Sequence, residues 1–328
     1  MTRDRRDRSM SAGPRFSIVT TNQAWLTPNL EAVDDTRYHA LYVVDHPAFP
    51  IPDPWTWLAF AAARTERIRL GTHVTGAPFH HPTNLAKQVA AVDCLSGGRA
   101  ILGIGTAYEH NDFAPYGFPM PNFHERVGLL DELLQVVRSL WTEDETRFRG
   151  LHFRLEGGAR FEPKPTSRPH PPIIVGLNRQ GRLLRIAAEQ ANGINTWQLG
   201  PEQVAALRPH VEAACERAGR PADALSLSSD VLCARGASRA EAEGLAGALS
   251  DVARSWGRGE GVTDWNASGV LHGDADAMAE QALRFAEVGV GELGVSFGSL
   301  EDALWFDEEV VARIHRTGEL DAGDEGQP

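Results

Sequence analysis

Short apolar runs alternate with longer amphipathic segments along most of the chain. Runs such as LYVVD, AILGIG and PIIVG are almost entirely apolar, which is typical of parallel strands buried on both faces. We predict strands at 16–20, 40–45, 68–75, 100–105, 172–177, 193–197, 225–233 and 293–298. Because helical patterns separate these strands, the sequence predicts an α/β fold of the (β/α)8 TIM barrel type. A doubly wound open sheet is the alternative, since strand counting does not show closure.

Two helices can be placed between these strands by their end signals. Pro82 suits the first turn of the helix LAKQVAAVDCL, and the glycines after Ser96 favour its end. Apolar residues at three- and four-residue spacing over 122–141 predict a second helix with one face on the barrel. The stretch TRFRGLHFRLEGG, centred on Gly150, predicts a hairpin inserted before the fifth strand.

One long segment shows neither helical nor strand periodicity of its apolar residues. Residues 235–271 contain two tryptophans and many glycines, and we expect an irregular region that serves as a lid or binding wall. The charged residues 1–14 are expected to be a disordered leader, and the acidic residues 319–328 a disordered tail. A single barrel domain with insertions is therefore predicted for 15–318.

Composition narrows the class of protein. The formal net charge is −12 and the arginines form no long basic stripe, so we expect no nucleic-acid partner. No apolar run approaches the ~20 residues that span a bilayer, and none follows the leader as in a secretory signal. Three scattered cysteines fit a reducing cytoplasm. Of the 32 basic residues only Lys87 and Lys164 are lysine, which suggests a high-GC genome.

The candidate chemistry lies just after the predicted strands, where barrel enzymes keep their active sites. Asp45 and His46 follow the second strand, and an imidazole can exchange a proton near neutral pH while a hydride moves elsewhere. The alternative is that Asp45 caps a loop and His46 only packs.

Two other interpretations have weaker support. His73, His80 and His81 could suggest a metal hydrolase, but their spacing fits metal ligation poorly and we expect no metal. The glycines of GIG at 103–105 could suggest a dinucleotide fingerprint, but the third glycine and the distal acidic residue are missing.

Three segments resemble a known family as a set: WTWLAFAAARTERIRLGT, HHPTNLAKQVAAVDCLSGGRAILGIG and NDFAPYGFP. They are similar to the luciferase-like monooxygenase superfamily, and the likeness covers roughly residues 15 to 200. It implies a bacterial luciferase-like barrel that binds coenzyme F420, a deazaflavin, or alternatively FMN. The Asp45-His46 pair favours the F420-dependent branch.

The resemblance also implies roles for particular residues. His46 would relay the proton, Asp45 and Asn111 would contact the cofactor ring, and a cis peptide His73–Val74 would form a bulge behind it. In glucose-6-phosphate dehydrogenases of this branch a catalytic glutamate stands where this chain has Tyr108, which argues against sugar-phosphate oxidation and makes Tyr108 a second catalytic candidate. The implied cofactor-binding residues are Asp45, His73, Val74, Thr75, Gly76, Thr106, Ala107, Asn111, Gly176, Leu177, Asn178, Arg179, Gln180 and Gly181.

The implied phosphate loop departs from the family pattern. Relatives carry a run of glycines after the fifth strand, whereas this chain reads GLNRQG. Arg179, Arg182 and Arg185 could partly compensate, because guanidinium groups bind phosphate well. The alternative is that these arginines form a solvated helix face.

Together these observations predict an oxidoreductase that transfers hydride between coenzyme F420 and an alcohol, carbonyl or activated alkene. An FMN-dependent monooxygenase using O2 and a non-catalytic flavin-binding homologue are the alternatives. We expect a homodimer and a small, non-phosphorylated organic substrate. The substrate expectation rests on the aromatic residues Trp25, Phe49, Phe79, Tyr108 and Trp197.

Overall fold

The structure, a computed structural model, describes residues 13–108, 110–179, 181–255 and 269–316. Within these residues, eight parallel strands close into a barrel in the order β1-β2-β3-β5-β8-β9-β10-β12. Closure follows because β10 pairs with both β9 and β12, and β12 pairs with β1. The strands are β1 (Arg15–Thr20), β2 (Ala40–Val43), β3 (Arg69–Thr72), β5 (Ala100–Gly105), β8 (Ile173–Gly176), β9 (Gly193–Trp197), β10 (Ser226–Arg235) and β12 (Glu292–Ser296). The predicted barrel is therefore confirmed and the open sheet is excluded.

The third predicted strand is interrupted. β3 ends at Thr72, and a two-residue strand β4 (Thr75–Gly76) then pairs with the far end of β5. Between them lies the cis peptide bond His73–Val74. The cis bond implied by the family resemblance is thus present at the named position, and it ends the strand three residues earlier than predicted.

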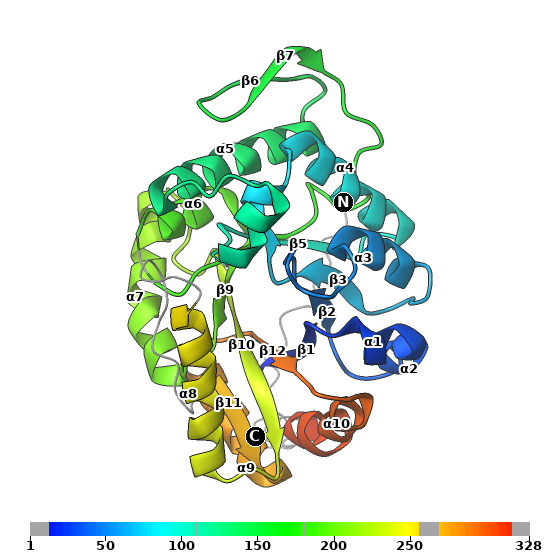
Figure 1. The fold of residues 1–328 in the computed structure, drawn as a ribbon, viewed down its shortest axis with the longest axis vertical. Coiled ribbons are helices and arrows are strands. Elements are labelled where there is room, and N and C mark those ends of the chain that lie inside the picture. The colour runs from blue at the N-terminus through cyan, green and yellow to red at the C-terminus, as the bar shows by residue number, and fades with distance from the viewer. Residues whose placement is uncertain (1–12, 109, 180, 256–268, 317–328) are drawn as a thin grey trace, which may run out of the picture.

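Helices form a ring around the strands, as Figure 1 shows. They are α1 (Gln23–Leu26), α2 (Leu30–Asp34), α3 (Pro54–Ala62), α4 (Pro82–Leu95), α5 (Phe123–Thr142), α6 (Arg182–Gln190), α7 (Pro201–Arg217), α8 (Arg239–Ser255), α9 (Ala275–Glu287) and α10 (Leu300–Phe306). Both helices placed from their end signals are confirmed. α4 begins at Pro82 and is followed by Gly97 and Gly98 at positive φ, while Asn122 caps α5.

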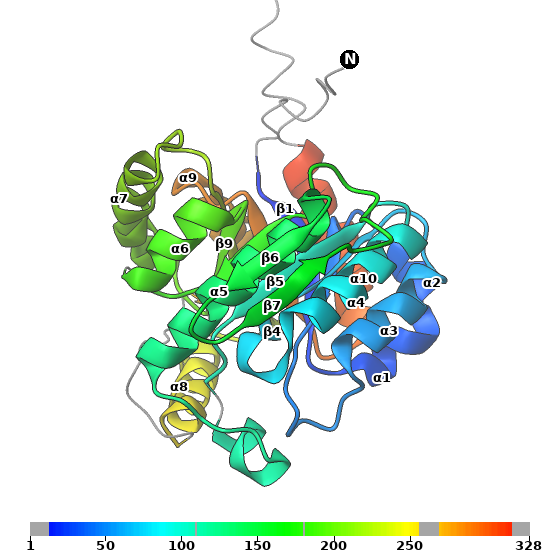
Figure 2. The same ribbon diagram turned by 90° about the horizontal axis from the view of Figure 1, so that it is seen from above.

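The predicted hairpin is also confirmed. β6 (Thr146–Arg149) and β7 (Arg154–Ala159) pair antiparallel and protrude at the top of Figure 1. In Figure 2 the hairpin lies in front of the barrel, between α6 and α7 on one side and α1 to α4 on the other. Glu132 of α5 anchors its turn by accepting hydrogen bonds from three backbone amides, at residues 151, 152 and 153.

The prediction of an irregular region at 235–271 is wrong for much of that stretch. Its first part forms the seventeen-residue helix α8, and its last part forms β11 (Val270–Gly273), which pairs with the end of β10. The alanine-rich sequence favours a helix, but Gly244 and Gly247 lower its helix propensity. Residues 256–268, with both tryptophans, lie outside the described residues, as do residues 1–12 of the leader and the whole tail.

The inside of the barrel is polar at several positions, whereas most such barrels are filled by branched apolar side chains. The Glu292 carboxylate accepts hydrogen bonds from the hydroxyls of Ser17 (2.6 Å) and Tyr42 (3.0 Å). Burial, together with the charge of Glu292, raises the pKa of Tyr42 well above its usual range, so this hydroxyl remains a donor. The apolar core lies mainly between the strands and the helices. Among the described residues, no helix is both long and apolar enough to cross a membrane.

Candidate active site

His46 follows β2 at the carboxyl ends of the strands and pairs with an acidic residue from another loop. Its Nδ1 lies 2.6 Å from Oδ2 of Asp112, and the amide of Ala48 donates to the other carboxylate oxygen at 2.9 Å. The His46 side chain is 16% exposed and that of Asp112 only 1%. Because a carboxylate can only accept, the proton of a neutral His46 lies on Nδ1 and the lone pair on Nε2.

Asp45 directly precedes His46 in the chain but has different hydrogen-bond partners. Its Oδ2 accepts a hydrogen bond from the amide of Gly76 (3.0 Å) and lies 2.7 Å from Nε2 of His80. Asp45 therefore ties the end of β2 to the loop that follows β4. His80 is thus paired with a single carboxylate, and no cluster of three or more metal-binding side chains exists among the described residues.

A further histidine–aspartate pair lies deeper in the barrel. Nδ1 of His73 is 3.1 Å from Oδ1 of Asp230, which also accepts from the amide of Asn195 at 3.0 Å. The His73 ring stacks on Tyr42, with 3.6 Å between the centroids. Its Nε2 has no hydrogen-bond partner among the described residues. The side chain of His73 therefore lies inside the barrel, whereas its backbone is part of the bulge at the cis bond to Val74.

The glycines around this bulge lie close against neighbouring residues of the chain. A Cβ at Gly105 would lie 2.7 Å from Cγ2 of Val74, and one at Gly176 would lie 3.0 Å from its Cγ1. A Cβ at Gly103 would lie 1.8 Å from the carbonyl oxygen of Thr72. Close packing therefore requires glycine at these three positions. In the structure they make room for the chain's own residues 72–74.

The side chain of Thr75, a predicted cofactor residue, is turned into the protein. Its hydroxyl accepts from the indole of Trp55 (3.1 Å) and donates to the hydroxyl of Thr72 (3.0 Å). Gly76 is equally enclosed, because a Cβ there would lie 2.5 Å from the Phe79 ring. Only the backbone of β4 could therefore contact a ligand.

Aromatic side chains surround His46. Phe49 stacks on its ring at 4.3 Å, and Tyr108 meets it edge-on at 6.0 Å. Tyr108 in turn lies 6.1 Å from Trp197, which ends β9. We call Phe49, Tyr108 and Trp197 the aromatic wall. It gathers three of the five predicted aromatic residues around one titratable side chain.

The other two aromatic residues lie elsewhere. Phe79 packs on Phe113 and Phe118, with 5.0 Å between centroids in each pair. Trp25, in α1, packs against the main apolar core. Thr106 and Ala107 connect β5 to Tyr108, and Ala107 has a positive φ of 53°.

The predicted phosphate loop connects β8 to α6. The amide of Leu177 is bonded to the carbonyl of Asn195, and the Asn178 side chain exchanges two hydrogen bonds with the backbone of Trp197 (2.9 and 2.8 Å). Gly181 has φ 134° and open space where a Cβ would stand. Gln180 lies outside the described residues. Backbone amides at the start of a helix attract anions, so this end of α6 can receive a phosphate.

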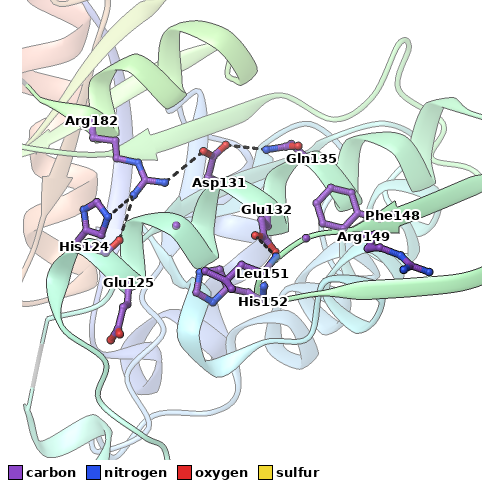
Figure 3. Close-up of a pocket in the computed structure, with 12 residues that line it drawn as sticks. His124, Glu125, Asp131, Glu132, Gln135, Phe148, Arg149, Leu151, His152 and Arg182 are labelled. Atoms are coloured by element: carbon purple, nitrogen blue, oxygen red, sulfur yellow. Dashed lines mark hydrogen bonds and ion pairs between the residues drawn. The ribbon is translucent and has the colours of Figure 1, made fainter.

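The three arginines near this loop are not equivalent. Arg185 pairs with Glu189 at 2.7 Å and lies 3.8 Å from Asp131, and Arg182 lies at the same distance from Asp131. Figure 3 shows Arg182 between His124 and Asp131, beside a cavity of about 390 Å³ against α5 and the hairpin. Acidic partners thus balance two of the expected phosphate-binding arginines. Arg179 instead lies over the Phe123 ring, with 5.6 Å to its centroid.

Sequence reasoning missed the two aspartates that orient the histidines. Asp112 is 66 residues from His46 and Asp230 is 157 residues from His73, so no local pattern links them. Asp230 still left a signal, because a charged residue in the middle of the strand SLSSDVLCAR is unusual in a buried strand. Asn111, predicted to contact the ring, is exposed and precedes Asp112 in the same short helical turn.

Comparison with known proteins identifies the family of this chain. The family model described as luciferase-like monooxygenase matches residues 30–292. An uncharacterized protein of Mycobacterium tuberculosis is 34% identical over 211 residues, which cover 57% of this chain and 72% of that protein. A protein of Intrasporangium calvum named F420-dependent glucose-6-phosphate dehydrogenase is 36% identical over 184 residues. The match covers 54% of each of these two chains, so it spans about half the length of that relative.

Solved structures show the same fold. The coenzyme F420 dependent tetrahydromethanopterin reductase from Methanopyrus kandleri superposes with a TM-score of 0.77 at 19% identity, over 92% of this chain and 99% of that one. The monooxygenase RslO1 from Streptomyces bottropensis gives a TM-score of 0.73 at 24% identity, over 91% and 99%. These identities support a common fold and nothing finer. The sequence matches go further, and the chain belongs to the luciferase-like monooxygenase family.

Proposed function

We propose that this protein is an oxidoreductase that transfers hydride between coenzyme F420 and a small organic alcohol, carbonyl or activated alkene. The observation that carries the proposal is the His46–Asp112 pair, a partly exposed imidazole held by a buried carboxylate at the active-site end of the barrel. Relatives named F420-dependent glucose-6-phosphate dehydrogenase support the choice of cofactor. So does the shared fold with F420-dependent enzymes.

In this proposal His46 exchanges the proton. Bound F420 supplies the hydride acceptor or donor. During alcohol oxidation the hydroxyl proton passes to Nε2 of His46, and during carbonyl reduction the same atom returns it. Asp112 positions the ring and stabilises the imidazolium that forms, as a carboxylate does for a catalytic histidine elsewhere.

The residues present fit such a cofactor. The open space at Gly181 and the amide groups at the start of α6 suit its phosphate, with Arg179 as the remaining cation of that loop. The backbone at His73–Val74 and β4, fixed by Asp45, would lie behind the ring. Asn111 and the segment Thr106–Ala107 stand on the opposite loop as further proposed contacts.

The test is a fluorescence titration of the purified full-length protein with F420 and, in parallel, with FMN. Tight binding of F420 alone, followed by its reduction with alcohols, is the expected result. Binding of F420 without turnover of any alcohol, ketone or enone would favour the non-catalytic homologue. Binding of neither cofactor would overturn the proposal.

A second candidate function is an FMN-dependent monooxygenase that uses reduced flavin and O2. The family model and solved neighbours such as RslO1 and the long-chain alkane monooxygenase LadA favour it. The same titration separates the two, because this candidate requires a preference for FMN. Consumption of O2 with reduced FMN would then be measured.

A further inference from the structure

The aromatic wall beside His46 carries information about the substrate. His46 contacts Phe49 face to face and Tyr108 edge to face, and Tyr108 continues into Trp197. Tyr108 is 38% exposed, so its ring offers apolar surface to a ligand beside His46. A molecule whose oxygen reaches Nε2 of His46 must therefore pass along aromatic surface.

The charges near this wall are negative. The carboxylates of Asp112 and Asp45 are both buried at the rim, each beside a histidine. Like charges in a partly desolvated site repel strongly, so a phosphate dianion would be disfavoured here. A cationic side chain would have to overcome this repulsion.

The lysines are held elsewhere. Lys87 donates to the carbonyl of Glu162 and lies over the Phe161 ring. Lys164 donates to the carbonyls of Leu140 and Glu143. Neither can serve as a phosphate clamp without giving up these bonds.

Two arginines follow barrel strands within the described residues, and both have other contacts. Arg235, at the end of β10, lies over Trp305 (4.5 Å) and near Glu301 and Asp302. Arg179 lies over the Phe123 ring and is the cation proposed for the cofactor phosphate. Among these residues, the groups that border His46 thus favour apolar contact over charge recognition.

We infer that the substrate is an uncharged, ring-bearing alcohol or ketone whose hydrocarbon ring packs on Tyr108 and Trp197 while its oxygen meets His46. This inference rests on the proposed function, since it names the substrate class of the same site. It separates this chain from the relatives named glucose-6-phosphate dehydrogenase, whose names specify a phosphorylated sugar. Tyr108 then acts through its ring, not through its hydroxyl.

The first experiment compares 1-phenylethanol, 2-propanol and glucose 6-phosphate as reductants of F420 with the full-length protein. We expect kcat/KM for 1-phenylethanol to exceed that for 2-propanol by ~100-fold, the scale on which extra apolar contact discriminates substrates. Glucose 6-phosphate should give no turnover. Preference for the sugar phosphate, or equal use of the two alcohols, would overturn the inference.

Binding is measured separately, so that failure of the cofactor proposal can be distinguished. Saturation-transfer NMR with acetophenone reports binding to the protein whether or not F420 binds, and loss of the signal in Trp197→Ala assigns the contact to the wall. Acetophenone contact without F420 binding would refute the proposed function and leave the wall as a ring-binding surface. F420 binding without acetophenone contact or 1-phenylethanol turnover would refute the substrate class alone.

Variants test which part of the wall matters. Trp197→Ala and Tyr108→Ala should raise KM for 1-phenylethanol by ~10–100-fold, with a smaller effect on kcat. Tyr108→Phe should restore KM, because it keeps the ring and removes only the hydroxyl. Tyr116→Ala, at an exposed tyrosine outside the wall, is the matched control and should change neither constant. Loss of kcat in Tyr108→Phe would instead assign the hydroxyl an acid/base role and overturn the packing role.

Discussion

Two of the three histidine–aspartate pairs among the described residues, His46–Asp112 and His73–Asp230, differ mainly in access. His46 and Asp112 are 2.6 Å apart, and the imidazole is 16% exposed. His73 and Asp230 are 3.1 Å apart, and the imidazole is 1% exposed and stacked on Tyr42. Since the groups are the same, their chemistry is decided by their surroundings. The outer pair is accessible to a ligand, whereas the inner pair connects β10 to the bulge after β3.

The two pairs should also respond differently when one member is removed by substitution. Loss of a partner deep in the barrel leaves a buried polar group unpaired, which lowers stability. Loss of a partner at the rim exposes the survivor to water, so stability changes less and reactivity changes more. The predictions that follow test this division.

The largest expected effect is on stability, at the inner pair. Asp230→Ala should lower the free energy of unfolding by ~3–5 kcal/mol, because His73 and Asn195 lose their common acceptor in a buried site. Urea unfolding followed by circular dichroism measures it. His210→Ala, at an exposed histidine of α7, is the control and should stay within ~0.5 kcal/mol. An Asp230→Ala loss as small as the control's would show that the inner pair has no structural role.

The next effect is on turnover, at the outer pair. His46→Ala should reduce kcat by ~100-fold or more, the usual scale for a lost acid/base. Cofactor affinity should remain within ~10-fold of the parent, because His46 handles the proton and not the ring. Steady-state kinetics and fluorescence titration check the two values, and unchanged turnover would remove His46 from the mechanism.

Asp112→Asn should have an intermediate effect on turnover, ~10–100-fold, since it keeps the shape but not the charge that orients His46. The pH dependence of kcat should also shift, which a purely structural substitution would not produce. In the double variant with His46→Ala, no further loss is expected, because Asp112 acts through His46. Additive losses would give Asp112 a separate role.

The smallest effect concerns a carboxylate far from both pairs. Burial alone would raise the pKa of Asp34, but hydrogen bonds from the amides of Glu66, Ile68 and Arg67 lower it below its usual value. A lowered folded-state pKa gives stability that is present above the unfolded pKa and lost as pH falls through the folded one. Asp34→Asn should therefore cost at most ~1 kcal/mol at pH 7, because solvent screens a half-buried group. Thermal unfolding between pH 7 and 3 should show the difference shrinking at the acid end.

The sequence predicted the fold well where burial of a strand requires a continuous run of apolar residues. The run at 100–105 coincides with β5 because a strand covered on both faces is apolar throughout. Helix α8 was missed because Gly244 and Gly247 lower the helix propensity of its sequence. Its neighbour β11 has only four residues, too few for a period to be read.

The site was predicted in part for a similar reason. His46 stands directly after a strand, so its position at the rim follows from the order of elements. Its partner Asp112, and the separate engagement of Asp45 with His80, depend on loop paths that bring distant residues together. The balancing of Arg182 was equally invisible, because Asp131 belongs to another helix, whereas Glu189 follows Arg185 by four residues on the same helix.

The fit of Val74 against Gly105 and Gly176 has a consequence for sequence variation. Each of the two positions has room only for glycine because the Val74 side chain occupies the adjacent space, so the three residues, from three different strands or loops, form one packing unit. Alanine at 105 should be accepted only when residue 74 is smaller, and a larger residue at 74 should never accompany alanine at 105 or 176. Among homologues these three columns should therefore change together, and a library that varies them singly would recover almost none of the combinations the fold allows.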